Sequence, residues 1–212
     1  MDDDKIFRLL SVVAEATAST SIIVNGTAMA PLLPKTTEEL AILWKQGRSA
    51  IAVRNGRIVG HASVEPLTNR WNELGVVWTD PGLREEGGPH RHVGLRLCSA
   101  LLERHREKYI LMTTVNPAMM VVGWRTGMVP IRYDQLPEAA WRATCCCPED
   151  KTGVPRKENV PHCRLRLLGC FVQVTWETWN GMDRPEPCTL PVCAPTSAVT
   201  IPRDDINILL AE

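Results

Sequence analysis

The chain has 212 residues, with 24 basic and 24 acidic side chains and a formal net charge of zero at pH 7. This balance argues against the broad basic surface that nucleic-acid binding requires. No apolar run approaches the roughly 20 residues needed to span a bilayer. The N-terminus is acidic where a signal peptide would be basic, so we expect a cytoplasmic protein with no nucleic-acid or membrane partner.

The length allows one main domain with an appendage. Seven of the eight cysteines follow residue 140, so they mark a local feature and not a disulfide framework for the whole chain. We therefore predict a main domain over residues 1–142 and a cysteine-rich extension over residues 143–212. The extension is expected to contain a last strand at 164–176 and a proline-rich tail. The sequence leaves the oligomeric state open, a dimer included.

The N-terminal part is predicted to contain two amphipathic helices separated by a short strand. Residues 2–18 place apolar side chains at helical spacing, and the β-branched run 21–27 predicts a strand. A second helix is expected to begin at Thr36 and to end at Gly47, with an apolar face that includes Leu40 and Leu43.

Three strands and a helix are predicted next. Residues 49–54 and 57–67 read as strands joined by Asn55-Gly56, the strongest short signal for a type I′ hairpin. Residues 71–79 form a third strand, after which Asp80-Pro81-Gly82 turns the chain into a loop that runs through His92. The helix over 93–107 is expected to bury one apolar stripe, made of Val93, Leu97, Cys98 and Leu101.

The apolar run 109–115 is a further strand. Because it follows a strand and a helix, we expect it to lie parallel to strand 71–79. Asn116-Pro117 then begins a helix that ends at Gly127, since Asn caps well and Pro is tolerated at the first position. A strand over 128–133 follows. These elements predict an α+β fold: a mixed, mostly antiparallel central sheet with a parallel strand pair at its centre, flanked by helices.

Residues 71–100 combine a strand, a turn rich in glycine and positive charge, and a helix. Unpaired backbone N–H groups and the positive end of a helix dipole favour a bound phosphate or pyrophosphate at such a turn. The alternative interpretation is a surface connection whose basic side chains are only solvated. The position of the turn between a strand and a helix favours phosphate binding.

The element order and two motifs resemble the GCN5-related N-acetyltransferase (GNAT) superfamily over residues 29–137. In that family an apolar strand ends in Val-x-Pro, followed by an Arg/Gln-x-x-Gly-x-Gly/Ala turn and a helix; residues 77–81 (VWTDP) and 89–94 (PHRHVG) are similar. The family motif Asn-Pro-x-Ala-x-x-x-Tyr-x-x-x-Gly-Phe is similar to residues 116–128 (NPAMMVVGWRTGM). Here His92 and Pro89 stand where the family has Gly and Arg/Gln, and Gly123 takes the tyrosine position.

The resemblance implies that the chain binds acetyl-CoA and acetylates an amine. It places the pantetheine arm along the strand end and on Asn116, and the pyrophosphate on backbone N–H groups of the turn. The implied cofactor residues are Val77, Trp78, Thr79, Arg91, His92, Val93, Gly94, Leu95 and Asn116. Glu73 is the candidate general base, the alternative being a solvated carboxylate at a strand edge. Tyr133 is the candidate general acid in place of the absent family tyrosine, with solvent as the alternative.

Two further groups of residues have side chains suited to chemistry. His61 alternates with Ala62 and Val64 in its strand, so it either faces an acceptor cleft or, as we favour, is a hydrogen-bonded structural histidine. Cysteine and histidine side chains after residue 140 suit tetrahedral zinc, and a metal would hold the proline-rich tail in shape. The candidate ligands are Cys145, Cys147, His162 and Cys163, with a tail cysteine (Cys188 or Cys193) as the alternative to His162. Reduced structural cysteines without metal are the equal alternative.

The sequence thus predicts an acetyl-CoA-dependent N-acetyltransferase that acts on a primary amine of a small molecule or a protein. The alternative hypothesis is a non-catalytic module on the same fold that binds CoA or zinc. Acetyl-CoA and an amine acceptor are the expected partners in the first case. The acceptor itself is not specified, because acceptor loops vary most among proteins that share a fold.

Overall fold

The computed structural model describes residues 2–19, 22–24, 27–29, 34–86, 92–106, 109–114, 116–131, 140, 169–173 and 205–210. The chain divides into two compact units. The first comprises Met1–Glu65, Leu74–His105 and Thr196–Glu212, and the second comprises Pro66–Glu73 and Arg106–Pro195. Residues 143–168 and 174–204 lie outside the described residues, so the predicted domain boundary at 142/143 stays a prediction.

The first unit contributes four described strands to the larger sheet, in the order β9, β3, β4 and the second half of β5. Their bounds are Asn207–Leu210 for β9, Ser49–Arg54 for β3, Arg57–Pro66 for β4 and Trp71–Thr79 for β5. Strand β3 is antiparallel to both β4 and β9. The β3–β4 turn has positive φ at Asn55 (50°) and Gly56 (76°), as the predicted type I′ turn requires.

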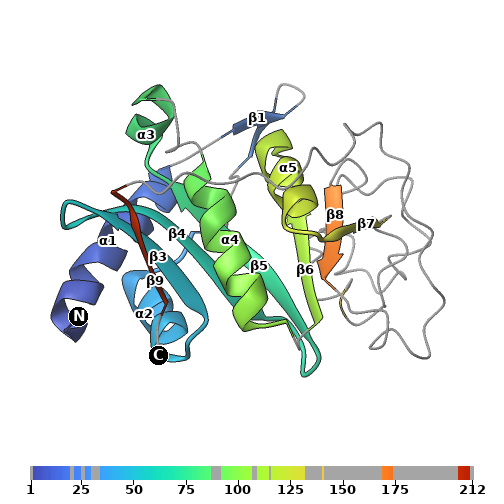
Figure 1. Ribbon diagram of the computed structural model, residues 1–212, viewed down its shortest axis with the longest axis horizontal. Helices are drawn as coiled ribbons and strands as arrows, with labels where there is room; N and C mark the ends of the chain where they lie inside the picture. The colour runs from blue at the N-terminus through green and yellow to red at the C-terminus, as the bar shows by residue number, and fades with distance from the viewer. Residues whose placement is uncertain are drawn as a thin grey trace. The chain divides into compact units, whose positions relative to one another are not determined.

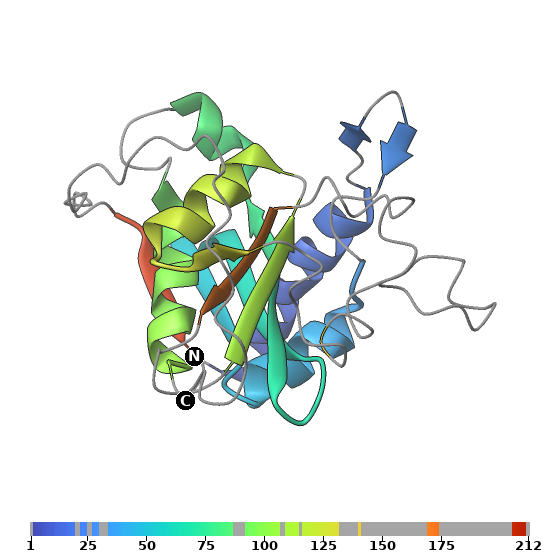
Figure 2. The same ribbon diagram turned by 90° about the vertical axis from the view of Figure 1, so that its right-hand side faces the viewer.

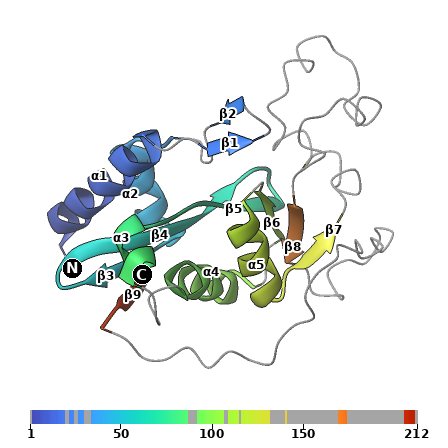
Figure 3. The same ribbon diagram turned by 90° about the horizontal axis from the view of Figure 1, so that it is seen from above.

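Helices cover both faces of this unit. Helices α1 (Asp3–Ser19) and α2 (Thr37–Lys45) lie on one side of β3 and β4, and α4 (Val93–Arg104) lies on the other, as Figure 3 shows. The predicted apolar faces are confirmed. The side chains buried on these three helices include Ile6, Leu9, Leu10, Val13, Leu40, Leu43, Val93, Leu97, Cys98 and Leu101.

Within the first unit, the C-terminal strand β9 is held by side-chain contacts of its neighbouring residues as well as by the β3–β9 ladder (Figure 1). The Arg96 guanidinium donates a hydrogen bond to the carbonyl of Ile206 at 2.8 Å. Arg54 forms an ion pair with Asp205 at 2.7 Å. Strand β9 therefore continues the sheet at β3 with residues far away in the sequence.

Two local predictions were wrong. Residues 81–86 were expected in a loop but form helix α3 (Pro81–Glu86), because Pro81 suits a first helical turn and the Asp80 carboxylate accepts a hydrogen bond from the Gly82 N–H at 2.9 Å. The single strand expected over 21–27 is a pair of antiparallel strands, β1 (Ile22–Val24) and β2 (Thr27–Met29). Helix α4 also ends at Arg104, earlier than the expected 107.

The second unit contains the first half of β5 with β6 (Tyr109–Thr114), β8 (Gly169–Gln173) and β7 (Val129–Ile131), in that order. Strands β5 and β6 are parallel, as predicted. Strand β8 is antiparallel to β6 and β7, and Figure 2 shows it alongside β6. Helix α5 (Pro117–Arg125) begins at Asn116 and is followed by Gly127 at φ 81°.

The predicted fold class is confirmed: the sheet is mixed, with one parallel pair and antiparallel pairs, and helices flank it. Among the described residues, no helix combines the length and the apolar character that a bilayer crossing demands.

Candidate cofactor site

A left-handed residue interrupts strand β5. Val76 has φ 46°, a conformation that is rare for a β-branched residue and costs on the order of 1–3 kcal/mol. Such strain persists only where the surroundings hold it, and it gathers at functional sites. Val76 directly precedes Val77, the first residue of the predicted cofactor strand end.

The conformation of Val76 changes which side chains face α4. A Cβ built on Gly75 would lie 3.3 Å from Glu65 Oε1, whereas Val77 Cγ1 and Thr79 Cγ2 lie 3.9 and 3.6 Å from a Cβ built on Gly94 in α4. In a regular strand, residues 75, 77 and 79 would share one face. The left-handed residue shifts this alternation by one position, so it presents Val77 and Thr79 to the first turn of α4.

Two side chains of β4 bind consecutive carbonyls of β5. Ser63 Oγ donates to the Gly75 carbonyl at 3.1 Å, and the His61 Nδ1 lies 3.0 Å from the Val76 carbonyl. Because a carbonyl only accepts, Nδ1 carries the proton in this contact. The peptide is planar and trans, so the Val77 N–H points away from the Val76 carbonyl and from His61.

His61 is the structural histidine that the sequence favoured. Its side chain is fully buried, and burial lowers the pKa of its imidazole from 6.5 to about 4. The ring is therefore neutral at pH 7. Within the described part of the chain, its Nε2 has no hydrogen-bond partner.

Within the described residues, no side chain caps the N-terminus of α4. His92 precedes the helix with φ −101° and ψ 8°, makes no capping hydrogen bond, and no acidic residue occupies the first turn. Helix α2 differs, because Thr36 and Glu39 form a complete capping box there. Within the described residues, His92 thus leaves the first N–H groups of α4 without a side-chain acceptor, and helix N-termini of this kind bind phosphate.

Glycine at position 60 sets how closely α4 approaches the sheet. A Cβ at Gly60 would lie 2.8 Å from Val93 Cγ1, 2.9 Å from Leu97 Cδ1 and 3.3 Å from the Trp78 carbonyl. The first two distances are shorter than real Cβ contacts, so glycine at position 60 leaves room for the Val93 and Leu97 side chains where they now lie.

The structure brings four of the predicted cofactor residues together in the first unit: Val77, Thr79, Val93 and Gly94. Val93 and Leu95 have buried side chains, so each offers only its backbone. Trp78 packs against the opposite cluster, which includes Leu10 and Ile51, and likewise offers only its backbone on the α4 side. Arg91 lies outside the described residues.

Asn116 belongs to the second unit, where it caps α5. Its side-chain oxygen accepts a hydrogen bond from the Ala118 N–H at 3.0 Å, and its own N–H donates to Thr114 Oγ1 at 3.0 Å. The side-chain carbonyl is thus committed to the helix cap. The side-chain NH2 group of Asn116 stays a predicted cofactor contact. Gly123, at the family tyrosine position, is buried.

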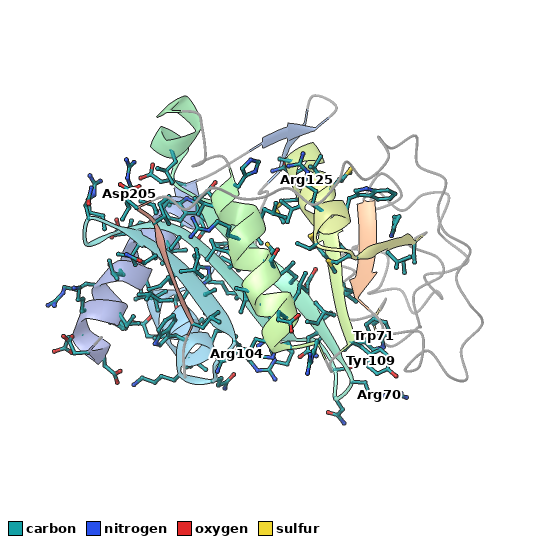
Figure 4. The ribbon with its side chains drawn as sticks, in the orientation of Figure 1. Arg70, Trp71, Arg104, Tyr109, Arg125 and Asp205 are labelled. Atoms are coloured by element: carbon teal, nitrogen blue, oxygen red, sulfur yellow. The ribbon has the colours of Figure 1, made fainter. Side chains whose placement is uncertain are left out.

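Glu73 lies on the half of β5 that pairs with β6, opposite Leu111. Thr113 donates its hydroxyl hydrogen to Glu73 Oε1 at 2.9 Å, and the Glu73 side chain is half-buried. This hydrogen bond orients the carboxylate, and the role of Glu73 as general base stays a prediction. At the start of the same strand, the Trp71 and Tyr109 rings are 5.3 Å apart and Arg70 lies over Tyr109 (Figure 4).

The remaining predicted site residues lie outside the described residues. These are Tyr133 and the four candidate zinc ligands Cys145, Cys147, His162 and Cys163. Among the residues that are described, no group of three or more His, Cys, Asp and Glu side chains could hold a metal ion. The general acid and the zinc site stay predictions.

Sequence reasoning missed the left-handed Val76 and its two β4 partners. One signal was present: Gly75 lies inside an apolar strand, and glycine at such a position often marks a bulge or a close approach of another group. Gly60 was a second signal of the same kind.

The chain was compared with known proteins by sequence and by structure. No protein-family model matches the chain, and no curated protein matches it in sequence. Among solved structures, Rv2747 from Mycobacterium tuberculosis, in complex with CoA and NLQ, matches with a TM-score of 0.51 and 14% identity over 82% of this chain and 96% of that one. The chain therefore has the GNAT fold.

Two other solved structures also match. N-acetylglutamate synthase from Neisseria gonorrhoeae, complexed with coenzyme A and N-acetyl-glutamate, has a TM-score of 0.45 and 16% identity over 80% of this chain and 32% of its own. Ribosomal-protein-alanine N-acetyltransferase from Brucella melitensis has a TM-score of 0.44 and 23% identity over 61% of this chain and 82% of its own.

Proposed function

We propose that the protein is an acetyl-CoA-dependent N-acetyltransferase that transfers an acetyl group to a primary amine of a small molecule or a protein. The observation that carries this proposal is the uncapped N-terminus of α4, with Gly94 packed against Val77 and Thr79. The GNAT fold of the chain supports the same assignment.

The residues present suit the cofactor. The backbone N–H groups of Val93, Gly94 and Leu95 are donors at a positive helix end, which suits a pyrophosphate. The Val77 N–H, turned away from β4, suits a carbonyl of the acyl-pantetheine arm. Gly94 adds no side chain between these two groups of donors. Asn116 and Arg91 remain proposed contacts of the same ligand.

The proposed reaction is direct acyl transfer. The nitrogen of the acceptor amine attacks the acetyl carbonyl of acetyl-CoA, the new C–N bond forms, and the C–S bond breaks to release the thiolate of CoA. Glu73, directly or through a water molecule, takes the proton that the amine loses, and Thr113 orients its carboxylate. Tyr133 is the proposed donor of the proton that the thiolate takes up.

A second function is favoured by one observation. Gly123 stands where family members carry a tyrosine, and this residue is buried and has no hydroxyl. A non-catalytic module that binds CoA, or zinc through the cysteine-rich extension, is therefore the alternative. The cytoplasmic location, and the absence of nucleic-acid and membrane partners, stay predictions of the composition.

A thiol-release assay tests the proposed function. Purified protein is mixed with acetyl-CoA and a panel of primary amines, and free CoA is measured with a thiol reagent. We expect turnover with at least one amine, and Glu73→Gln should lower kcat by about 10²-fold, in the range for loss of a general base. Glu38→Gln, the same change on the exposed side of α2, is the matched control. Bound zinc at one ion per chain without turnover would favour the alternative.

A further inference from the structure

We infer that His61 is a positioning residue that holds the Val76 peptide in its left-handed conformation and so aims the end of β5 at the cofactor. This inference rests on the proposed function for its catalytic consequence. The contact itself is a 3.0 Å hydrogen bond between a fully buried imidazole and the carbonyl of Val76.

The left-handed conformation needs a support, because Val76 is β-branched and strained. Its side chain belongs to the apolar cluster formed with α1 and α2, which explains its burial but not the direction of its peptide. Hydrogen bonds of defined direction fix a peptide plane better than apolar contacts do. His61 supplies that bond, and Ser63 supplies the corresponding bond to the preceding carbonyl of Gly75.

The register of the sheet explains why the His61 side chain can reach the Val76 carbonyl. His61 pairs with Ile51 across β3 and β4, so its ring lies on the face that α1 and α2 cover. On the other face, Gly60 contacts the side chains of α4. Strand β4 thus reaches the Val76 carbonyl from the covered face, where no bulk water competes for the hydrogen bond.

The consequence for the site follows from the alternation. With Val76 left-handed, Val77 and Thr79 face Gly94 and the first turn of α4. If the Val76 peptide relaxed to an extended conformation, residues 77 and 79 would return to the face of Gly75 and Glu65. The backbone that lies along the proposed acyl arm would then be misdirected, while the phosphate end at α4 would be unchanged.

Two substitutions separate this role from simple packing. His61→Asn keeps an N–H donor at the δ position of the side chain, whereas His61→Leu fills similar space without a donor. We expect His61→Leu to lower kcat at least about tenfold, as misplacement of a reacting group does, with KM for acetyl-CoA changed less than about threefold. His61→Asn should recover most of that loss. Equal kcat values in the two variants would overturn the inference.

A second measurement does not depend on catalysis. Nitrogen-15 NMR of the wild-type protein at pH 7 should show a neutral His61 ring with its proton on Nδ1, and a proton on Nε2 would overturn the inference. If the wild-type protein failed to bind CoA, the proposed function would be refuted. The NMR result alone would then decide whether His61 holds Val76.

Discussion

The two faces of strand β4 contact their neighbours in different ways. On the face toward α4, Gly60 has no side chain, and the helix packs close to the strand. On the face toward α1 and α2, His61 and Ser63 carry polar side chains that bind carbonyls of β5. On one face the missing side chain lets α4 pack closely, and on the other face two hydrogen bonds hold strand β5.

This difference shows how one strand can define a site from two directions. Gly60 sets the distance of the α4 N-terminus, where the proposed pyrophosphate contacts lie. His61 sets the direction of the peptide that leads to Val77 and Thr79. Changes on the two faces should therefore have separable effects, which the following predictions test.

The largest expected effect is the loss of stability in acid that His61 causes. Its pKa is lowered from 6.5 to about 4 in the folded protein, so between these values the unfolded chain binds a proton that the folded chain does not. Stability is therefore complete above about pH 6.5 and falls as the pH falls toward 4, by about 3 kcal/mol in total. Urea unfolding of the wild type and His61→Asn at several pH values measures this. The free energy of unfolding of the variant should fall less steeply with falling pH than that of the wild type. Parallel plots of this free energy against pH would contradict the prediction.

Gly60→Ala should have the next largest effect, on the other face. The added methyl would lie 2.8 Å from Val93 Cγ1 and 2.9 Å from Leu97 Cδ1, so these side chains must repack and push α4 outward at its N-terminal half. Overpacking of this kind costs about 1–3 kcal/mol. We expect a lower midpoint in thermal unfolding together with weaker CoA binding in calorimetry. If the variant were destabilised but bound CoA with unchanged affinity, the position of α4 would not matter for cofactor binding.

Ser63→Ala should destabilise the protein by about 1 kcal/mol, because it removes a hydroxyl that lies 3.1 Å from the Gly75 carbonyl and 3.3 Å from Glu65 Oε1. The matched control is Ser49→Ala. Ser49 is the cross-strand partner of Ser63, is also buried, and within the described residues its hydroxyl has no hydrogen-bond partner. Urea unfolding should show a loss for Ser63→Ala alone. Equal losses in both variants would show that burial of the side chain, and not the bond to β5, matters.

The smallest effect on stability is expected for Gly94→Ala, with a sign opposite to the others. A methyl there meets Thr79 and Val77 at ordinary contact distances of 3.6 and 3.9 Å. Removing a glycine from a helix should stabilise the fold by about 0.5–1 kcal/mol. The same methyl would lie between α4 and the bound arm, so CoA affinity should fall. A variant that gained both stability and affinity would place the cofactor elsewhere.

Much of the fold followed from local patterns in the sequence. The Asn55-Gly56 turn, the Asn116-Pro117 helix start and the apolar stripe of α4 each depend on neighbouring residues, and the structure confirms them. The parallel β5–β6 pair followed from connection rules. What could not be predicted depends on contacts between distant residues: His61 with Val76, and β9 with β3.

In the candidate site, too, features set by neighbouring residues could be predicted and features set by distant contacts could not. Its location at the end of β5 and the start of α4 could be predicted from the strand, turn and helix pattern. The left-handed Val76 could not, because valine gives no local signal for it and its support comes from β4. The helix α3 was missed although Asp80-Pro81 could have indicated it.

Calorimetric titration of the wild-type protein with CoA and with pantetheine shows whether the N-terminus of α4 binds the phosphates of CoA. Pantetheine has the arm of CoA but none of its phosphates. We expect CoA to bind at submillimolar concentration and pantetheine to bind at least about tenfold more weakly, because phosphate contacts at a helix N-terminus are lost. No CoA binding in that range, or equal affinity for the two ligands, would contradict it.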